Sequence, residues 1–429
     1  MIIKENILNN GWHIIKFSDC IKQLNTGLNP RNNFSLGSGK LKYITAKNLT
    51  KFGTIDFSKC DFIDEDAKKI IHKRSDIRRG DILFSSRAPI GHCHLITEDP
   101  DFYDIGESIF SIRVNQDVAL PEYLCLYLAS DYFVKVASKH TTGSIIMEIR
   151  ISDLMNTEII IPPREIQKNI AKCLNKIDRK IELNKMVNDN LEQQLMLLYD
   201  YWFIQFDFPD NNGNPYQISG GKMVWNDTLR RNIPENWKVQ SVISNCLSSV
   251  IKPGVKIFNT KTYLATADVK GTSISTGTIV DYDGRESRAN MQPSINSVWF
   301  AKMKNSIKHL YLNKEMQPII SSSILSTGFC GLQCNEISFE YIASYVSNAY
   351  FEIHKDMLAH GATQEAVNND DLAGVHIIIP EDTVLCAYHE TTQAIYAQIS
   401  KNVCENQELV KLRDWLLPML MNGQATIND

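Results

Sequence analysis

One stretch of the chain occurs twice, and this repeat limits the possible folds more than any other feature of the sequence. A shift of 218 residues, the distance from Gly143 to Gly361, superposes the isoleucine-rich segment 159–162 on the segment 377–380 without a gap. After each of these segments, apolar residues recur at alternating spacings of four and three within a long polar stretch. Such spacing is typical of a coiled-coil seam, which is narrower than the apolar stripe of an ordinary surface helix. The chain is therefore expected to contain two related long helices.

The two predicted seams share an unusual detail, an asparagine at the fifth and at the sixth of ten positions. The first seam consists of Ile170, Leu174, Ile177, Ile181, Asn184, Asn188, Leu191, Leu195, Leu198 and Trp202. The second consists of Tyr388, Thr392, Ile395, Ile399, Asn402, Asn406, Leu409, Arg413, Leu416 and Leu420. A seam asparagine weakens packing but fixes register, because a shifted partner leaves its amide buried without a hydrogen bond.

An antiparallel pair would place Asn184 opposite Asn406 and Asn188 opposite Asn402, about a local pseudo-two-fold axis. Connectivity favours this arrangement, because the first helix leads away from one globular region and the second leads back. The alternative is two unrelated amphipathic helices, each packed on its own domain. That alternative does not explain the matched asparagines.

The composition is that of an ordinary globular protein with room for two or three domains. Its 429 residues are 43% hydrophobic and 22% charged, with a formal net charge of −4. This charge argues against a histone-like basic protein, although local basic faces can still bind nucleic acid. No apolar run approaches a membrane span, and the N-terminus lacks a signal-peptide pattern. Ten cysteines without paired short spacings indicate a reducing cytosol.

The region before the first long helix alternates short apolar runs with turn residues, which predicts a mixed α/β or α+β fold. The candidate strands are 42–46, 81–85, 94–97 and 108–114, and the candidate helix is 122–138. Segment 68–79 carries six basic residues against the single acid Asp76. It is either a solvated helix face or a surface that contacts phosphates.

Residues 204–235 are rich in Asn, Gly and Pro and are expected to form an irregular connector. A region similar to the first then begins again, since Trp12 corresponds to Trp237 and Tyr43 to Tyr263. The residues between these matches differ almost completely. This pattern suggests one scaffold that carries two different reading domains.

Motifs for catalysis or cofactor binding are weak. Segment 37–40, Gly-Ser-Gly-Lys, lacks the spacing of a phosphate-binding P-loop. On a strand, Cys93 would point away from His92 and His94, so these three residues are not expected to share a metal. Cys330 and Cys334 lack other clustered ligands and are expected to be structural thiols. We therefore predict neither a catalytic residue nor a metal ligand.

The chain resembles, over essentially its whole length, the DNA-specificity subunits of type I restriction–modification enzymes. The most specific motifs are the segments 160–167 (IIPPREIQ), 180–184 (KIELN) and 412–418 (LRDWLLP). Segment 80–85 and Gly143-Ser144 ahead of Asp153-Leu154 also fit. The second helix departs from the pattern, because Glu381 replaces the usual second proline and no glutamine stands where Gln167 would map.

The resemblance implies a mixed α/β (α+β) protein whose two target-recognition domains are separated by two long antiparallel coiled-coil helices, with an internal pseudo-two-fold repeat. The expected boundaries are 1–162 for the first recognition domain, 163–203 for the central helix, 204–235 for the connector, 236–380 for the second recognition domain and 381–422 for the C-terminal helix. Each domain is expected to read one half of an asymmetric, split double-stranded DNA site.

The same resemblance implies a non-catalytic cytoplasmic subunit that assembles with two methyltransferase subunits and with motor–nuclease restriction subunits. S-adenosylmethionine, ATP and magnesium would belong to those partners, and this chain would need no cofactor and no membrane. The alternatives are the specificity chain of another restriction–modification type, a DNA-modifying enzyme of another class and a protein-binding coiled-coil scaffold. Unaided modification or cutting of DNA by the single chain would identify an enzyme.

The expected DNA contacts are polar and basic residues of turn-rich loops in both globular regions. In the first region the candidates are Arg31, Asn32, Asn33, Lys47, Asn48, Arg87, Thr142 and Ser144. In the second they are Lys261, Thr266, Lys270, Arg285, Arg288, Lys302, Lys304, Thr363 and Gln364. A buried side chain would be removed from this set. Which bases they would read does not follow from the sequence, because direct readout depends on which side chains reach base edges.

Two further expectations concern the helices. They are expected to expose side chains for the methyltransferase subunits, on the first helix Gln167, Leu183, Tyr199 and Phe203. The alternative is that these residues only pack against their own domains. The helices are also expected to act as a ruler that sets the gap between the two half-sites, at about 1.5 Å of helix per residue.

Overall fold

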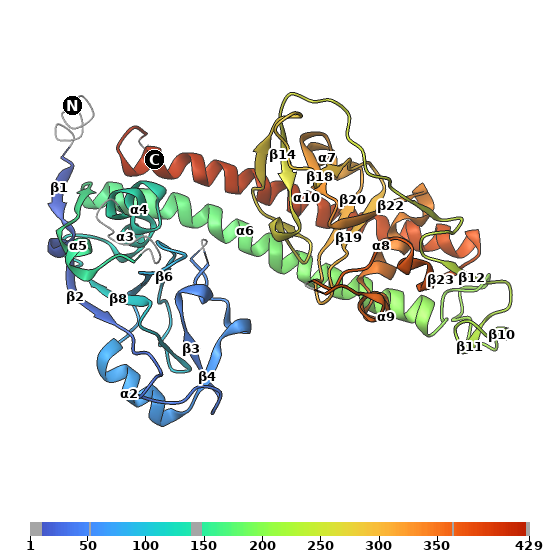
Figure 1. The fold of residues 1–429 in the computed structure, drawn as a ribbon, viewed down its shortest axis with the longest axis horizontal. Coiled ribbons are helices and arrows are strands. Elements are labelled where there is room, and N and C mark those ends of the chain that lie inside the picture. Colours follow the sequence, from blue (N-terminus) through green and yellow to red (C-terminus); the bar gives the residue numbers. More distant parts are fainter. Residues whose placement is uncertain (1–10, 51–52, 139–147, 363, 426–429) are drawn as a thin grey trace. The chain divides into compact units, whose positions relative to one another are not determined.

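The chain forms two compact units in a computed structural model that describes residues 11–50, 53–138, 148–362 and 364–425. The first unit comprises residues 1–179 and 410–429, and the second comprises residues 180–409. Each long helix contributes one part to each unit, so every unit combines a globular region with a piece of both helices (Figure 1).

The first globular region contains two small sheets and a two-stranded ribbon. One sheet has the order β2-β8-β5-β6, and its strands are Ile21–Thr26, Ile109–Val114, Ile82–Ser85 and Cys93–Leu95. The other has the order β4-β3-β7, and its strands are Asp61–Ile63, Leu41–Ile44 and Tyr103–Ile105. In the ribbon, β1 (His13–Lys16) pairs antiparallel with β9 (Glu158–Ile161). Strand β9 is the isoleucine-rich segment of the repeat, and it leads directly into the first long helix.

Four helices accompany these strands, and their bounds are Glu65–Ser75 for α2, Pro121–Leu128 for α3, Asp131–Ser138 for α4 and Ile151–Asn156 for α5. The expectation of one continuous helix over residues 122–138 is wrong. Ser130 separates α3 from α4, because its hydroxyl accepts a hydrogen bond from the backbone N–H of Phe133 at 3.2 Å and so caps the second helix. Short 3₁₀ turns occur at Phe17–Cys20 (η1), Ala46–Asn48 (η2) and Phe57–Lys59 (η3).

The second globular region repeats this arrangement of strands. One sheet has the order β13-β22-β19-β20, with strands at Ser248–Val250, Phe329–Cys334, Ser297–Ala301 and His309–Leu312. The other has the order β17-β14-β21-β18, with strands at Thr278–Val280, Lys261–Leu264, Ser323–Ser326 and Ala289–Met291. Strand β12 (Lys238–Ser241) pairs antiparallel with β23 (His376–Ile379), as β1 does with β9. A short hairpin joins β15 (Val269–Lys270) to β16 (Ser273–Ile274).

The helices of this region are α7 (Gln317–Ser322), α8 (Phe339–Ser347) and α9 (Ala349–Leu358), with 3₁₀ turns η5 (Thr266–Asp268), η6 (Lys314–Met316), η7 (Glu336–Ser338) and η8 (Asp371–Gly374). The weak sequence matches between the two regions are confirmed, since Tyr43 on β3 and Tyr263 on β14 occupy equivalent strands. Each of these strands also has a parallel neighbour, β7 or β21. Two divergent sequences therefore share this strand order, and the second region adds β18 beside β21.

The connector is more regular than its composition suggested. Strands β10 (Met223–Asn226) and β11 (Arg231–Pro234) form an antiparallel hairpin within it. Its aromatic residues join the core of the second unit, where Phe208 stacks on Trp237 with ring centroids 4.9 Å apart. The turn residues were correctly recognised, but the short alternating strands on either side of the turn were missed.

Helix α6 (Arg164–Tyr199) and helix α10 (Asp382–Met421) are the two predicted long helices. Within the second unit they run antiparallel, because Asn184 donates a hydrogen bond to Asn406 Oδ1 at 3.0 Å and Asn402 donates one to Asn188 Oδ1 at 2.7 Å. These are the two pairs that the sequence pattern predicted. Within the first unit the seam residue Arg413 is buried and forms an ion pair with Asp178 at 3.1 Å.

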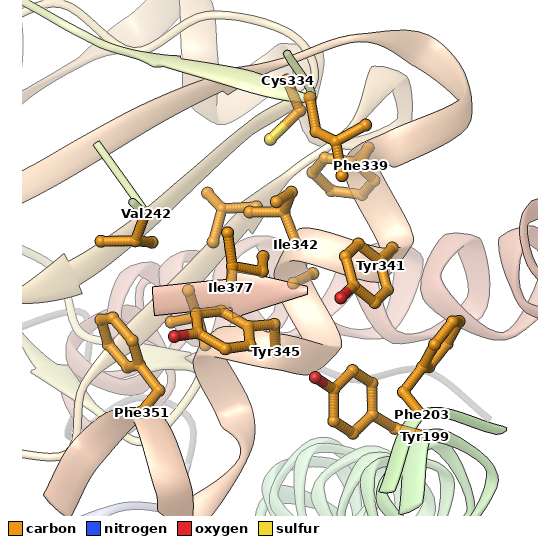
Figure 2. Packing of buried hydrophobic residues seen from close by; sticks show 14 of the residues in the cluster. Tyr199, Phe203, Val242, Cys334, Phe339, Tyr341, Ile342, Tyr345, Phe351 and Ile377 are labelled. Atoms are coloured by element: carbon orange, nitrogen blue, oxygen red, sulfur yellow. The ribbon is translucent and has the colours of Figure 1, made fainter. Parts of the chain in front are cut away.

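The end of α6 is embedded in an aromatic core of the second unit. A π-helical turn (η4, Asp200–Ile204) follows the helix. Tyr199 and Phe203 lie beside Tyr341 of α8, and the Phe203 and Tyr341 ring centroids are 4.6 Å apart (Figure 2). Such edge-on aromatic pairs add about 0.5–1.5 kcal/mol to ordinary burial. This packing fixes the second globular region to its part of the first long helix.

The asparagine layer consists of the pairs Asn184–Asn406 and Asn188–Asn402. Replacement of only one asparagine of a pair should lower the free energy of unfolding. The substitution Asn188→Leu leaves the buried Asn402 amide without its 2.7 Å acceptor, so we expect a loss of about 1–3 kcal/mol in unfolding free energy. The double variant Asn188→Leu with Asn402→Leu should recover most of this loss. Urea unfolding measures both values, and Asn190→Leu on the exposed face of α6 is the control. A single variant as stable as the unsubstituted chain would contradict the prediction.

Candidate nucleic-acid interface

Equivalent 3₁₀ turns after β3 and β14 hold the first group of expected contact residues. In η2, Asn48 Oδ1 accepts the backbone N–H of Thr45 at 2.8 Å, and in η5 Asp268 accepts that of Ala265 at the same distance. Asn48 is buried, so its amide closes the turn and we remove it from the expected contacts. Its neighbour Lys47 is exposed.

Glu107 brings together two loops of the first region that carry expected contacts. Arg87 donates a hydrogen bond to Glu107 Oε1 at 2.8 Å, and Asn29 donates one to Glu107 Oε2 at 2.6 Å. These bonds, with the nearby positive charge of Arg31, hold the pKa of Glu107 below its usual range. Arg87 also pairs with Glu148 at 3.0 Å. Arg31, Asn32 and Asn33 are exposed on the adjoining loop.

The loop between β19 and β20 carries the basic cluster of the second region. Lys302 and Lys304 lie on this loop, and Lys304 pairs with Glu365 at 2.7 Å. Asn305 adopts a left-handed φ of 55°, and Asp356 accepts its backbone N–H at 3.1 Å. The glutamate is next to Gln364, another expected contact, which is exposed. The structure thus brings the lysines and Gln364 to one place.

The remaining candidates of the second region lie on other loops. Arg285 stacks on Tyr282, with its guanidinium carbon 3.9 Å from the ring centroid, and Arg288 is exposed. Lys261 is partly buried, and this burial lowers its pKa. Thr266 lies on η5, where its backbone carbonyl accepts a hydrogen bond from Lys308. Lys270 is exposed on β15. The three candidates Thr142, Ser144 and Thr363 lie outside the described residues.

A basic cleft beside α2 was recognised from the sequence only as a charged segment. It is lined by Gln23, Asn25, Glu65, Lys68, Lys69, His72, Lys73, Arg74 and Asp76. Arg74 donates a hydrogen bond to Thr26 Oγ1 at 3.0 Å, which holds its side chain across the cleft. The basic segment therefore lines an open cleft, with Arg74 held against β2.

Sequence reasoning missed a buried polar network behind the lysine loop. His309 and Glu352 are joined at 2.8 Å, and Lys355, whose side chain is fully buried, lies 2.6 Å from the same carboxylate. Burial opposes ionisation of Glu352, but hydrogen bonds from His309 and Lys355 hold its pKa below the usual value. Sequence spacing gave no signal, because the strand and the helix that supply these residues are far apart in the chain.

A hairpin fixes the second region to both long helices inside the second unit. Thr272, in the turn between β15 and β16, donates a hydrogen bond to Glu192 of α6 at 2.6 Å. Gln407 of α10 donates another to the backbone carbonyl of Ile274. Through this hairpin, the second globular region is fixed directly to both long helices.

Comparisons with known proteins find specificity subunits of type I restriction enzymes. The family model described as "Type I restriction modification DNA specificity domain" matches residues 9–193. The MjaIX type I restriction enzyme specificity subunit of Methanocaldococcus jannaschii is 26% identical over 97% of this chain and 94% of its own length. The HindI type I restriction enzyme specificity subunit of Haemophilus influenzae is 24% identical, over 81% of this chain and 87% of its own.

The chain is thus similar to type I restriction–modification specificity subunits, through the family model over residues 9–193 and through relatives that align with most of its length. A solved S subunit of a type I restriction–modification system from M. genitalium covers 96% of this chain and 96% of its own, with 14% identity and a TM-score of 0.49. No helix among the described residues is long and apolar enough to cross a membrane. In the same part of the chain, no three His, Cys, Asp or Glu side chains gather as a metal site would require.

The exposed surface of α6 differs from the one expected. Gln167 is buried and accepts the backbone N–H of Leu120 at 2.7 Å, while Tyr199 and Phe203 belong to the aromatic core. Three of the four expected docking residues therefore hold α6 to its own globular regions, and only Leu183 is exposed. A docking surface on α6 would therefore require a different set of exposed side chains.

That set can be found in the structure as exposed apolar residues on the long helices. On α6 they are Leu183, Met186, Val187, Met196 and Leu197, and on α10 they are Leu412 and Trp415. The repeat shift of 218 residues places Leu197, 69% exposed, on Trp415, 57% exposed. Spacing alone could have predicted this pair, because both residues lie outside the seam. We call Leu197 and Trp415 the paired apolar sites.

Proposed function

We propose that this chain, a non-catalytic DNA-specificity subunit, recognises an asymmetric DNA site in two halves, one half for each globular region. The observation that carries this proposal is the shared strand order of two regions whose loops differ in sequence. Two regions with the same arrangement of strands but different loop side chains can each bind DNA in a similar way and recognise a different base sequence. Contacts to phosphates would position each region, and contacts to base edges would give sequence preference.

We further infer that the two long helices carry partner subunits, with methyltransferase subunits at the paired apolar sites and restriction subunits completing the assembly. The support is the repetition of one exposed apolar position on both helices, since an internal two-fold repeat offers two copies of one partner equivalent surfaces. S-adenosylmethionine, ATP and magnesium belong in this scheme to the partners. DNA as ligand and ten free cysteines support a cytoplasmic location.

Methylome sequencing of the host with and without this gene tests the proposed function. We expect one methylated motif, split into two dissimilar halves by unread base pairs, to disappear with the gene and to return with a plasmid copy. A methylome that is unchanged by the deletion would refute the proposal. Loss of an unsplit motif would refute the division into two reading regions.

The helices are proposed to set the number of unread base pairs between the halves. Seven residues inserted between Arg179 and Lys180 of α6, and seven between Leu409 and Val410 of α10, keep the 4–3 spacing and fall at the border between the two units. Each helix lengthens by about 10 Å, which matches about three base pairs of B-DNA. We expect the same half-sites with a spacer about three base pairs longer.

The methylome of the host that carries this double insertion gives the spacer directly. The control is a single insertion in α6 alone, which leaves the asparagine pairs aligned but separates Asp178 from Arg413, and it should reduce methylation at every spacer length. An unchanged spacer in the double variant would show that the helices do not set the distance.

A further inference from the structure

In each globular region, one loop of a sheet contacts a segment from later in the chain. The two loops are equivalent, because one follows β5 and the other follows β19. In the first region, Ile149 donates its backbone N–H to the carbonyl of Ser86 at 2.9 Å. In the second, Val367 donates to the carbonyl of Lys302 at 3.0 Å. The repeat shift of 218 residues places Ile149 on Val367, so the two backbone contacts are the same feature of the frame.

At each of these contacts a basic side chain of the loop is paired with a glutamate of the segment. Arg87 pairs with Glu148 at 3.0 Å, and Lys304 pairs with Glu365 at 2.7 Å. The residues are offset by one position from exact equivalence, so they are not simply retained from the repeat. Two sequences that otherwise differ almost completely have arrived at the same electrostatic arrangement.

Stability does not account for these pairs. The side chains of Lys304 and Glu365 are 35% and 48% exposed, and exposed ion pairs contribute only about 0–1 kcal/mol. Arg87 is paired with two carboxylates, those of Glu148 and Glu107, although one carboxylate would neutralise its single positive charge. In both regions the paired cation is one of the residues expected to contact DNA.

We propose that Glu148 and Glu365 are internal competitors for the DNA phosphate, which lower the affinity of the chain for non-specific DNA and so sharpen its sequence discrimination. The inference rests on the proposed function. A phosphate that approaches Arg87 or Lys304 competes with the carboxylate that is already paired with the cation. Non-specific binding depends almost entirely on such phosphate contacts, whereas a cognate site adds base contacts that offset the displacement.

The substitution Glu365→Gln should release Lys304 for one phosphate while it preserves the shape of the side chain. Each neutralised phosphate adds about 0.9 to the slope of log K against log salt concentration, so one gained contact strengthens non-specific binding up to about eightfold at 0.1 M salt. Binding to the cognate duplex should change less, and the ratio of cognate to non-specific affinity should fall several-fold. Glu148→Gln should act through Arg87 with a smaller effect, because Glu107 still pairs with Arg87 at 2.8 Å.

A double-mutant cycle separates this mechanism from a general loss of negative charge. The full chain, assembled with its methyltransferase subunits, is titrated over a range of salt concentrations with the methylated motif in one duplex and a scrambled duplex in another. The variants are Glu365→Gln, Lys304→Gln and both together, and Glu286→Gln is the control at an exposed acid of the same region. We expect the effect of Glu365→Gln to vanish in the Lys304→Gln background.

An equal effect in both backgrounds, or no change in non-specific affinity, would overturn the proposal. A similar gain from Glu286→Gln would also overturn it, because the effect would then reflect net charge. These outcomes differ from failure of the proposed function, in which the unsubstituted complex would show no preference for either duplex. Thermal unfolding of each variant confirms that the comparison is made between folded chains.

Discussion

The double substitution Leu197→Asp with Trp415→Asp is expected to prevent assembly with the methyltransferase subunits without unfolding the chain. Both side chains are largely exposed in the free chain, so aspartate costs little there. In a complex, each aspartate would be buried in an apolar contact without a partner, which we expect to cost about 3 kcal/mol or more at each site. The affinity should therefore fall more than about a hundredfold.

The single variants make this prediction sharper, because the two sites should act separately. Co-purification and light scattering should find two methyltransferase subunits on the unsubstituted chain, one on either single variant and none on the double variant. Met357→Asp, at an exposed apolar residue of α9 away from the long helices, is the control and should retain both partners. Two bound partners on the double variant would place the docking surface elsewhere.

The second large effect is expected from exchange of a whole reading region. Replacement of residues 236–380 by the equivalent segment of a relative should change one half of the methylated motif completely and leave the other half unchanged. The boundaries follow from the ribbon, because β12 pairs with β23 from Lys238 opposite Ile379 to Ser241 opposite His376. An exchange that ended at residue 372 would pair a donor strand with a host strand.

Methylome sequencing of the chimaera reads both halves in one experiment. The control is the same exchange in the first region, over residues 11–162, which should change the other half. If either exchange altered both halves together, the two regions would not read DNA independently. Loss of all methylation from a folded chimaera that still binds its partners would count against the chosen boundaries.

The long helices and their pairing could be predicted because the seam depends on spacing that one sequence carries. Asn184 and Asn188 identified the register, and the connectivity of the chain identified the antiparallel direction, which the hydrogen bonds to Asn406 and Asn402 confirm. The exposed helix face was harder to predict. Tyr199 at the end of α6 and Phe203 in the following turn η4 are buried because α8 packs against them, which the sequence of the helix does not reveal.

The strand order of the globular regions was foreseen only in outline, because weak matches such as Tyr43 with Tyr263 do not specify neighbours. Ion pairs between loops were not foreseen at all. Arg87 could be selected by its charge, but its partners Glu107 and Glu148 come from two other segments of the chain. Such contacts depend on tertiary structure, and residue type alone does not reveal them.

The two ribbons have a consequence at the level of the gene. Each globular region begins and ends on adjacent antiparallel strands, β1 with β9 and β12 with β23. The last strand of both ribbons ends in the same run of three isoleucines, and proline follows it. Recombination within the stretch of gene that encodes this run, between two genes or between the two halves of one gene, would transfer an entire globular region with its strand pairing intact. Both long helices, and every side chain that they expose, would be inherited unchanged.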